Sequence, residues 1–404
     1  MMAAHVTGMG LVCPAGIDVA SSWDAMLAGV GKASRDPNLE GIRVDFSARV
    51  PEAFDAAALL GRQARKLERF VILALASLKE AVASSELDTS TWDPTRVGVV
   101  MGCGIGGAPI WDEQHEVMRE RGSDRVTPHL IPRLISNMVS GHISMELGST
   151  GPNMVTATAC ASATTAIGTA LDLLRSGRCD VVFAGGAEAA ITPLSVAGFD
   201  NMTALSRNGA DPSKASRPFD KDRDGFVIAE AAGILVLETP EHAKARGATP
   251  LAKIAGYGAS ADAFHTTAPH PEGVGAAQAV KAALADAGLT PEDIQHVNAH
   301  GTSTPLNDKA ESLMIAQTLG DHVAVTSSKG VTGHSLGAAG AVEAILTVKA
   351  ITEGVVPHTA NCEQLDPEVA CDVVTGAPRE VEIRAALSNS FGFGGQNAVL
   401  AITQ

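Results

Sequence analysis

Aromatic residues are scarce in this chain of 404 residues, in which Phe, Trp and Tyr together make up only 3%. Few aromatic stacking surfaces are therefore expected, whereas 41 glycines indicate many turns and close backbone contacts. Positively charged residues are also few: the chain has 30 Lys and Arg but 45 Asp and Glu, which gives a net charge of −15. Such an acidic chain is a poor ligand for nucleic acid or for anionic membrane surfaces, so neither partner is expected.

Long apolar runs are missing as well, and the N-terminus has no charged and apolar regions of the secretory type. We therefore expect a cytoplasmic protein. The six cysteines are scattered, without C-x-x-C or a close Cys/His cluster, which argues against a disulfide framework and a metal clip. A hydrophobic content of 45% with 19% charged residues predicts a globular protein with one or two large cores.

The stretch from Met154 to Gly186 has the pattern of a strand, a turn, a buried helix and a second strand. Its β-branched run stops at Cys160, and small residues then lead into the apolar positions of 171–174. Cys160 is thus predicted at a helix N-terminus, where backbone N–H groups and the helix dipole favour a nucleophilic thiolate. The alternative is a packed core cysteine, since cysteine is among the most buried residue types.

Two further segments of the N-terminal half bear on function. We predict a helix from Gly61 to Val82, in which Arg62, Arg65, Lys66 and Arg69 recur at three- and four-residue spacing on one face. That face is either simply solvated or a docking patch for an acidic partner. The second segment, Gly104 to Gly107, follows a predicted strand but lacks both G-x-G-x-x-G spacing and a following Lys-Ser/Thr, so we reject phosphate binding.

The two halves of the sequence share one pattern of predicted elements. In each, a predicted strand ends in a reactive polar residue that is followed by a Gly/Ala-rich helix: Cys160 in the first half, and Lys329 and His334 in the second. Small residues allow such helices to pack closely at a shared centre. We therefore expect two similar α/β halves, each with a mixed sheet, stacked face to face over residues 1–245 and 246–404.

Cys160, His300 and His334 all stand beside glycine at predicted strand or loop ends. Each histidine alone could be an ordinary surface or core residue, but strand ends of α/β folds converge on one crevice. A thiol with two imidazoles suits carbon–carbon bond formation on thioesters. The cysteine would carry an acyl group while the imidazoles stabilise an enolate.

Four stretches resemble the motifs of the β-ketoacyl-[acyl-carrier-protein] synthases, the type II elongating condensing enzymes of the thiolase superfamily. They are 158–162, 300–309, 329–334 and 389–395, and the resemblance extends over essentially the whole chain. It implies a thiolase-like α/β fold whose two halves form five layers, αβαβα. It also implies decarboxylative Claisen condensation of an acyl group on Cys160 with malonyl-acyl carrier protein, in fatty-acid or type II polyketide synthesis.

The resemblance implies catalytic roles position by position. Cys160 takes the acyl group, and His300 and His334 promote decarboxylation of the malonyl thioester and stabilise the enolate. Lys329, together with Glu311, belongs to the supporting polar network. The backbone N–H groups of Cys160 and Phe393 form the oxyanion hole. The substrate-binding residues that the resemblance implies are Trp111, Phe199, Thr302, Thr304, Phe391 and Phe393, of which the two threonines hold the pantetheine arm and Phe393 is a gate.

It likewise implies partners. No cofactor is required, because the substrates are carried on phosphopantetheine, but a structural Na⁺ or K⁺ is expected. Its ligands would be Asn298, Glu343, Ser388 and Asn389. Acyl carrier protein is the expected partner, and Arg62, Arg65 and Lys66 fall where the family docks it. The chain would form a homodimer, or a heterodimer with a chain-length-factor homologue.

Some positions depart from the family pattern. Ala229–Gly233 replaces a common Gly-Glu-Gly-Ala-Gly, Ala163 stands where glycine is usual, and Gln396 replaces a frequent His or Thr. None removes a catalytic group. Trp111 falls where the family has a smaller apolar residue in the acyl tunnel, so we expect it to favour short or flat acyl groups. The alternative is an indole turned outward.

Three other classes compete with a self-sufficient condensing enzyme. A non-catalytic chain-length partner should lack the nucleophile, yet Cys160 is present. A coenzyme A thiolase should carry a second cysteine near the C-terminal glycines, and 391–395 has none. A cysteine hydrolase would need a water-activating site that no motif supplies. Fatty-acid and polyketide enzymes share these motifs, so both pathways and all acyl lengths stay open.

Overall fold

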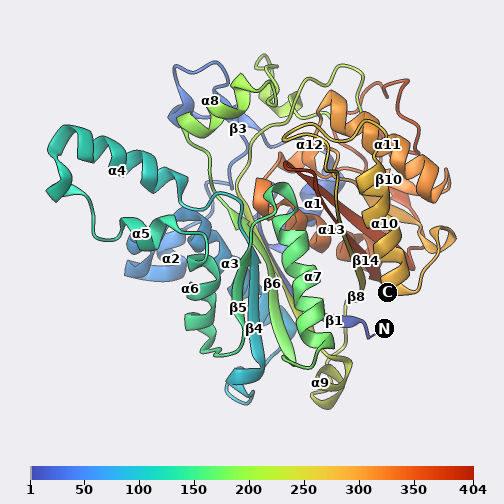
Figure 1. Ribbon diagram of the computed structural model, residues 1–404, viewed down its shortest axis with the longest axis horizontal. Helices are drawn as coiled ribbons and strands as arrows, with labels where there is room; N and C mark the ends of the chain where they lie inside the picture. The colour runs from blue at the N-terminus through green and yellow to red at the C-terminus, as the bar shows by residue number, and fades with distance from the viewer. Residues whose placement is uncertain (1) are drawn as a thin grey trace.

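The computed structural model describes residues 2–404, over which ten strands join in one large sheet (Figure 1). The first five strands are β1 (Ala4–Val12), β4 (Val97–Gly102), β5 (Asn153–Thr156), β6 (Val181–Glu188) and β7 (Ala231–Glu238). The second five are β8 (Ala252–Ala261), β9 (His296–Asn298), β10 (Ala324–Thr326), β13 (Ala385–Gly392) and β14 (Gln396–Thr403). Two small ribbons pair β2 (Ser34–Arg35) with β3 (Phe46–Ser47) and β11 (Val355–Val356) with β12 (Arg379–Glu380).

Both sets of five strands have the same topology. From its outer edge the first set runs β5-β4-β6-β7-β1 and the second runs β10-β9-β13-β14-β8. Numbered along the chain, each set therefore reads third, second, fourth, fifth, first. In both, the three outermost strands pair in parallel and the remaining pairs are antiparallel. The predicted similarity of the halves is confirmed, whereas the division at residues 245 and 246 stays a prediction.

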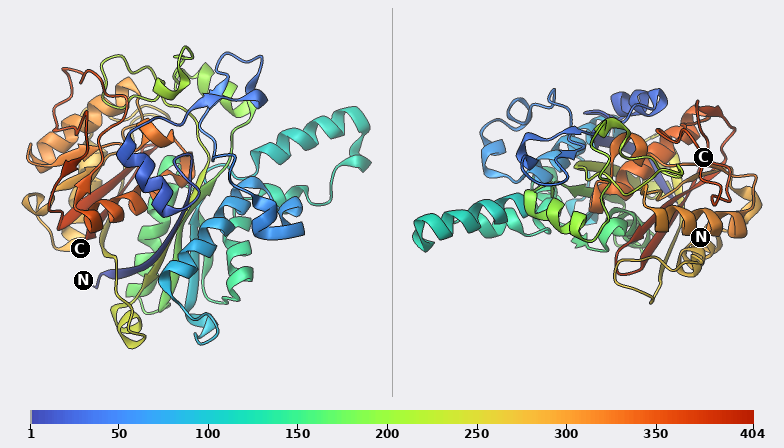
Figure 2. Two further views of the ribbon diagram at one scale, coloured as in Figure 1. Left: turned by 180° about the vertical axis from the view of Figure 1, so that it is seen from behind. Right: turned by 90° about the horizontal axis from the view of Figure 1, so that it is seen from above.

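Helices fill the space between and outside these two sets of strands (Figures 1 and 2). At the centre, α7 (Ser162–Arg175) and α13 (Ala339–Glu353) contact each other and strands of both sets. The outer faces are covered by α3 (Arg69–Ser85) with α6 (Met138–Leu147), and by α10 (Val274–Ala287) with α11 (Pro305–Leu319). This confirms the predicted αβαβα layers, although β1 also pairs with β8, so the two sheets are joined edge to edge.

Small residues let the two central helices approach closely. A Cβ added at Gly340 of α13 would lie 2.0 Å from Thr164 Oγ1 of α7, a distance that no side chain tolerates. Ile167 and Leu171, three and seven residues after Thr164 on the same side of α7, are fully buried in the core. Because α7 begins just after Cys160, this tight central packing fixes where the cysteine lies.

The remaining helices are α1 (Val19–Ala28), α2 (Ala56–Leu60), α4 (Ala108–Arg121), α5 (Leu130–Leu134), α8 (Pro193–Asn201), α9 (Pro240–Ala245) and α12 (Lys329–Thr332). Of these, α4 and α5 project from the body of the molecule (Figure 1). None of the helices in residues 2–404 combines the length and the apolar character that crossing a membrane requires.

The single helix predicted over 61–82 is wrong. Instead, a 3-10 segment covers Gly61–Lys66, the chain is extended at Glu68, and α3 begins at Arg69. Arg69 is drawn inward by an ion pair with buried Glu230, 2.7 Å long, so it does not share a face with the three basic residues before it. The basic residues of 62–66 therefore lie on a separate, exposed turn.

Candidate active site

Cys160 lies at a strained turn between a strand and a helix. The strand β5 ends at Thr156, earlier than its β-branched pattern indicates, and a 3-10 turn at Ala159–Ala161 leads into α7. Ala159 has φ +49°, a conformation that costs free energy for any residue with a Cβ. The hydroxyl of Ser162 braces the turn by accepting from Thr158 N–H at 2.9 Å and donating to the Ala159 carbonyl at 2.6 Å.

Burial makes the resting sulfur a thiol. The side chain is 8% exposed, and burial raises the pKa of Cys160 to about 11, although the Lys329 ammonium and nearby backbone N–H groups oppose this rise. The expectation that the helix N-terminus favours a thiolate is therefore wrong for the resting site, because desolvation dominates. A nearby base must take the proton when the thiol reacts.

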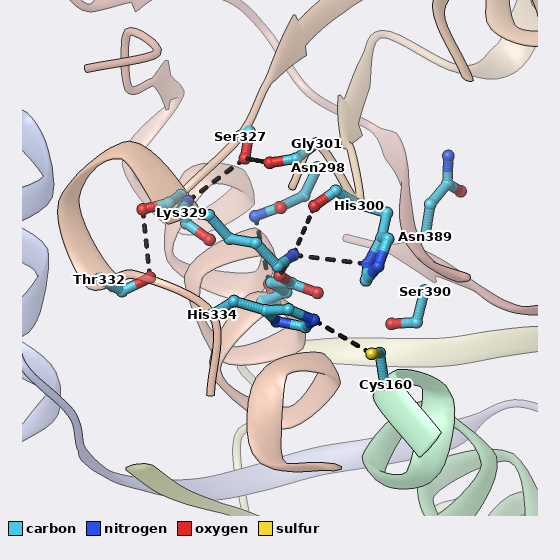
Figure 3. Close-up of polar contacts among 12 residues, drawn as sticks. Cys160, Asn298, His300, Gly301, Ser327, Lys329, Thr332, His334, Asn389 and Ser390 are labelled. Carbon is cyan, nitrogen blue, oxygen red and sulfur yellow. Dashed lines mark hydrogen bonds and ion pairs between the residues drawn. The ribbon is translucent and has the colours of Figure 1, made fainter. Parts of the chain in front are cut away.

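His334 is placed to be that base. Its Nε2 lies 3.1 Å from Cys160 Sγ (Figure 3), and the ring is buried. Burial and the neighbouring Lys329 charge hold the pKa of His334 well below its usual range, so the imidazole is neutral near pH 7. Both backbone polar groups of His334 are hydrogen-bonded, because its N–H donates to Val227 O and its carbonyl accepts from Ala229 N–H.

His300 faces the same space from the second half of the molecule. Its ring centre lies 5.4 Å from that of His334, at an interplanar angle of 83°. Burial, Lys329 and His334 all hold the pKa of His300 well below its usual range. Lys329 Nζ lies 3.5 Å from His300 Nδ1 (Figure 3). The site therefore offers two neutral imidazoles beside one thiol.

Lys329 forms a buried ion pair with a carboxylate of the central helix. Its ammonium pairs with Glu343 of α13, not with Glu311, and both members of this pair are buried. Burial raises the pKa of Glu343 to about 7 against the effect of Lys329. Glu311 instead accepts the backbone N–H groups of His300 and Gly301, each at 2.8 Å, and so fixes the turn that carries the histidine.

Two backbone donors converge on the sulfur. The N–H groups of Phe393 and of Cys160 itself both point at Sγ, and both lower the pKa of the thiol. Phe393 lies in the hairpin turn between β13 and β14, and a Cβ on the preceding Gly392 would come within 2.6 Å of Thr158 O. Paired N–H donors at a reacting sulfur can stabilise the oxyanion of an acyl group bound there.

A cavity of about 510 Å³ brings most of the predicted residues together. Its lining includes Cys160, His300, His334, Phe199, Thr302, Thr304, Phe391 and Phe393. The Phe199 and Phe393 rings are 6.4 Å apart, and the hydroxyls of Thr302 and Thr304 are 2.9 Å apart. Ile105 and Leu306 also line it, and both lie in stretches singled out in the sequence. Four further lining residues had no distinctive signal, because only tertiary packing brings them here: Met202, Asp262, Leu336 and Asn397.

Trp111 does not line this cavity in the single chain. It lies on the projecting helix α4 and is 52% exposed. Ile110 and Gln114 are the buried residues of that helix, one turn apart, so the next position along the chain is rotated away from the body. The expectation that the indole narrows the cavity is therefore not met within one chain.

Five buried side-chain oxygen atoms lack a partner in the described residues, Ser328 Oγ among them, and the other four belong to the residues named for a monovalent cation. These four are Asn298 Oδ1, Glu343 Oε2, Ser388 Oγ and Asn389 Oδ1. Buried oxygens without hydrogen bonds are costly, and hard cations prefer such ligands, so this donor set fits Na⁺ or K⁺. Cys160, His300 and His334 also have potential ligand atoms within 4.8 Å of one another.

The basic residues expected to dock a carrier protein lie apart from the cavity lining. Arg62, Arg65 and Lys66 are exposed, and over residues 2–404 none of them forms an ion pair. Arg69 and Arg133 nearby are instead engaged with buried carboxylates, Glu230 and Glu68. The turn 62–66 therefore carries three exposed positive charges that no carboxylate of the described residues pairs with.

This fold and this cysteine–histidine–histidine cavity define a thioester condensing enzyme, and comparison with known proteins agrees. The family model "Beta-ketoacyl synthase, N-terminal domain" matches residues 3–243, and "Beta-ketoacyl synthase, C-terminal domain" matches residues 251–363. The chain belongs to the β-ketoacyl synthase family, as its motifs predict.

Named relatives are similar along nearly their whole length. A 3-oxoacyl-[acyl-carrier-protein] synthase 2 of Synechocystis is 45% identical, with 98% of this chain and 96% of that protein covered. One from Staphylococcus aureus is 42% identical with the same coverage. Among solved structures, a β-ketoacyl synthase from Burkholderia phymatum has a TM-score of 0.93 and 33% identity, covering 100% of both chains. The ishigamide ketosynthase/chain length factor also has a TM-score of 0.93 and 33% identity, covering 100% of this chain and 99% of that one.

Proposed function

We propose that this protein catalyses the decarboxylative condensation of an acyl group held on Cys160 with malonyl-acyl carrier protein, giving β-ketoacyl-acyl carrier protein. The observation that carries the proposal is the contact of Cys160 Sγ with His334 Nε2 at 3.1 Å in a cavity that His300 also lines. The test is to supply acyl- and malonyl-carrier protein and to measure β-ketoacyl thioester and CO₂. One CO₂ per product is expected, and acyl transfer to water or coenzyme A without CO₂ would contradict the proposal.

The first half-reaction is transfer of the acyl group to the enzyme. The Cys160 thiol gives its proton to the neutral His334, and the sulfur attacks the carbonyl carbon of the acyl thioester. The N–H groups of Cys160 and Phe393 stabilise the oxyanion. The new carbon–sulfur bond then replaces the bond to the carrier, and the departing thiolate takes the proton from His334.

The second half-reaction makes the carbon–carbon bond. Malonyl thioester loses CO₂, and the electron pair of the broken bond forms an enolate whose oxygen accepts hydrogen bonds from His300 and His334. Neutral imidazoles suit this task, and burial together with Lys329 holds both pKa values low enough to keep them neutral. The enolate carbon attacks the acyl carbonyl on Cys160, the carbon–sulfur bond breaks, and the released thiolate takes one proton from water.

Acyl carrier protein is proposed to dock on the basic turn of Arg62, Arg65 and Lys66. Reversing two of these charges, as in Arg65→Glu with Lys66→Glu, should raise KM for carrier-bound substrate about tenfold and leave kcat nearly unchanged. It should also weaken the dependence of KM on salt. The matched control reverses two exposed charges elsewhere, Lys281→Glu with Arg384→Glu. An unchanged KM at low salt would contradict the docking role and leave the turn as an ordinary solvated surface.

A monovalent cation is proposed to bind the four partnerless oxygens of Asn298, Glu343, Ser388 and Asn389. Because Glu343 also pairs with Lys329, the cation would stabilise the carboxylate beneath the catalytic network. We expect replacement of choline by K⁺ or Na⁺ at equal ionic strength to raise the unfolding temperature by about 2–5 °C.

Ser388→Ala tests the cation site directly. It should abolish the ion-specific rise in unfolding temperature, whereas Ser140→Ala, which removes another fully buried hydroxyl, should retain it. Equal unfolding temperatures of the natural protein in choline and in K⁺ or Na⁺ would rule the site out.

A second subunit is proposed to cover the projecting side of the molecule. Large apolar side chains are exposed there on α4, α5, α6 and the loop between α5 and α6: Trp111, Met118, Ile131, Ile135 and Met145. The strand β5 is also an edge strand of the sheet. Apolar surface next to an open edge favours a protein interface. The partner is a second copy or a chain-length-factor homologue, such as accompanies the ketosynthase in the ishigamide structure.

The pathway and the compartment complete the proposal. The relatives named as synthase 2 favour fatty-acid elongation, whereas a structure titled as a type II polyketide acyl-carrier protein in complex with its ketosynthase matches with a TM-score of 0.91 and 30% identity. A cytoplasmic location is supported by the cysteines, all six of which are free thiols.

A further inference from the structure

The glycine-rich turn that follows β4 already binds an anion, and that anion belongs to the protein. Three consecutive backbone N–H groups, from Gly104, Ile105 and Gly106, converge on the carboxylate of Glu188 at the end of β6. The distances are 2.6 Å from Gly104 N to Oε2, 3.2 Å from Ile105 N to either oxygen and 3.0 Å from Gly106 N to Oε1. This internal carboxylate occupies the place that a phosphate takes in a nucleotide-binding loop.

Glu188 is held by the turn and by the cysteine that precedes it. It is fully buried, and in residues 2–404 no basic side chain forms an ion pair with it. Its remaining contact is the Cys103 thiol, which donates to Oε1 at 3.5 Å. Burial raises the pKa of Glu188, and the three N–H donors oppose that rise. The carboxylate and the turn are therefore mutually dependent: moving either leaves buried polar groups without partners.

The turn forms part of the cavity wall beside the nucleophile. Gly104 and Ile105 line the cavity together with Cys160, Leu336 and Gly337. Gly337 packs closely against both the turn and Glu188. A Cβ added at Gly337 would lie 2.4 Å from Gly104 N and 2.7 Å from Glu188 Oε2, so the turn has little room to move in that direction. The same turn leads directly into α4, which begins at Ala108. The position of Glu188 thus sets the position of the Ile105 wall.

The second half of the molecule has an equivalent arrangement. Its turn after β9, at His300 and Gly301, is held by the buried carboxylate of Glu311. β4 and β9 are each the second strand of their set, so the two turns are topological counterparts. Glu311 holds a turn that bears a catalytic histidine, whereas Glu188 holds one that bears an apolar side chain, Ile105. Their effects on the reaction should therefore differ.

We propose that Glu188 is a positioning residue that holds the 104–106 turn against the cavity and thereby determines which acyl groups Cys160 accepts. This inference rests on the proposed function, because it assigns Glu188 to the acylation half-reaction. It requires selectivity among acyl groups to change when Glu188 changes, while the decarboxylation of malonyl thioester stays intact.

The experiment uses Glu188→Gln in the full chain. The amide nitrogen of Gln cannot accept a hydrogen bond, so at least one N–H of the turn loses its acceptor. Rate constants for Cys160 acylation are measured by intact mass for linear saturated acyl-carrier thioesters from four to sixteen carbons, beside the rate of malonyl decarboxylation. We expect the ratio of long- to short-chain rate constants to change about tenfold, with decarboxylation within about twofold of the natural protein.

The control is Glu80→Gln. Glu80 also accepts two backbone N–H groups, from Leu11 and Val19 at 2.8 Å each, but it does not line the cavity. Glu80→Gln should leave the ratio of long- to short-chain rate constants unchanged. If Glu188→Gln does not fold, Glu188→Asp and Ile105→Ala serve in its place, the first by withdrawing the carboxylate and the second by cutting back the wall.

The outcomes separate clearly. An unchanged ratio in folded variants of Glu188, or an equal loss for every chain length together with decarboxylation, overturns the positioning role. Failure of the natural protein to acquire any acyl group on Cys160 instead overturns the proposed function. An altered ratio in Glu80→Gln of the same size would show a general effect of destabilisation and would also overturn the role.

Discussion

Cys160→Ala is expected to lower the rate of condensation by about 10⁴-fold or more, because the acyl group then has no atom to bind. The other five cysteines are buried and none of them lines the cavity. Malonyl decarboxylation should persist in this variant, since His300 and His334 remain. The product is quantified by chromatography of the β-ketoacyl thioester, and CO₂ release is followed in parallel.

The matched control for this variant is Cys179→Ala. It removes a thiol that is fully buried in the central core, so it reports the cost of cavity formation without touching the site. Its rate should stay within a few fold of the natural protein at a temperature where both are folded. Retention of condensation by Cys160→Ala would show that the acyl group is carried elsewhere.

His300→Ala and His334→Ala are each expected to lower malonyl decarboxylation by about 10²–10³-fold, because each removes one donor to the enolate. The two should differ in acylation. His334 contacts Cys160 Sγ at 3.1 Å and takes its proton, so His334→Ala also slows loading, whereas His300→Ala loads at nearly the natural rate. Single-turnover loading and CO₂ release separate the two steps, and His322→Ala, an exposed histidine, serves as control.

The pH dependence of decarboxylation tests the protonation state of the same two histidines. Their pKa values lie below the ordinary 6.5, so the neutral forms persist to lower pH than those of a free imidazole. The rate should therefore be flat through neutral pH and fall only in acid below that value. A fall centred at or above 6.5, or normal decarboxylation in both alanine variants, would contradict the assigned roles.

The sequence was most informative where chemistry is encoded in short motifs. The strand–turn–helix around Cys160 and the glycine-flanked histidines were predictable, because local patterning determines both the elements and the ends at which the side chains stand. The similar strand–helix patterns in the two halves of the sequence also predict that the two halves share one order of strands. These features depend on residues close in sequence or on topology rules that few folds escape.

What sequence could not supply was side-chain direction across the fold and the degree of burial. Two carboxylates were available to Lys329, and only packing decides that Glu343 faces it while Glu311 turns to the His300 backbone. Burial similarly reverses the expected state of the Cys160 thiol. The expectation for Trp111 depends on family position alone, and the projection of α4 carries this residue away from the cavity of its own chain.

In the proposed mechanism, Cys160 carries the acyl group that condenses with the malonyl unit. The most direct measurement is intact-mass analysis after mixing the protein with acyl-carrier thioesters, followed by peptide mapping and then addition of malonyl-carrier protein. One acyl adduct per chain is expected on Cys160, and it should disappear when malonyl-carrier protein is added, with β-ketoacyl product formed in its place. An adduct on Cys103 or Cys179 with Cys160 unmodified, or an adduct that malonyl-carrier protein does not discharge, would contradict this mechanism.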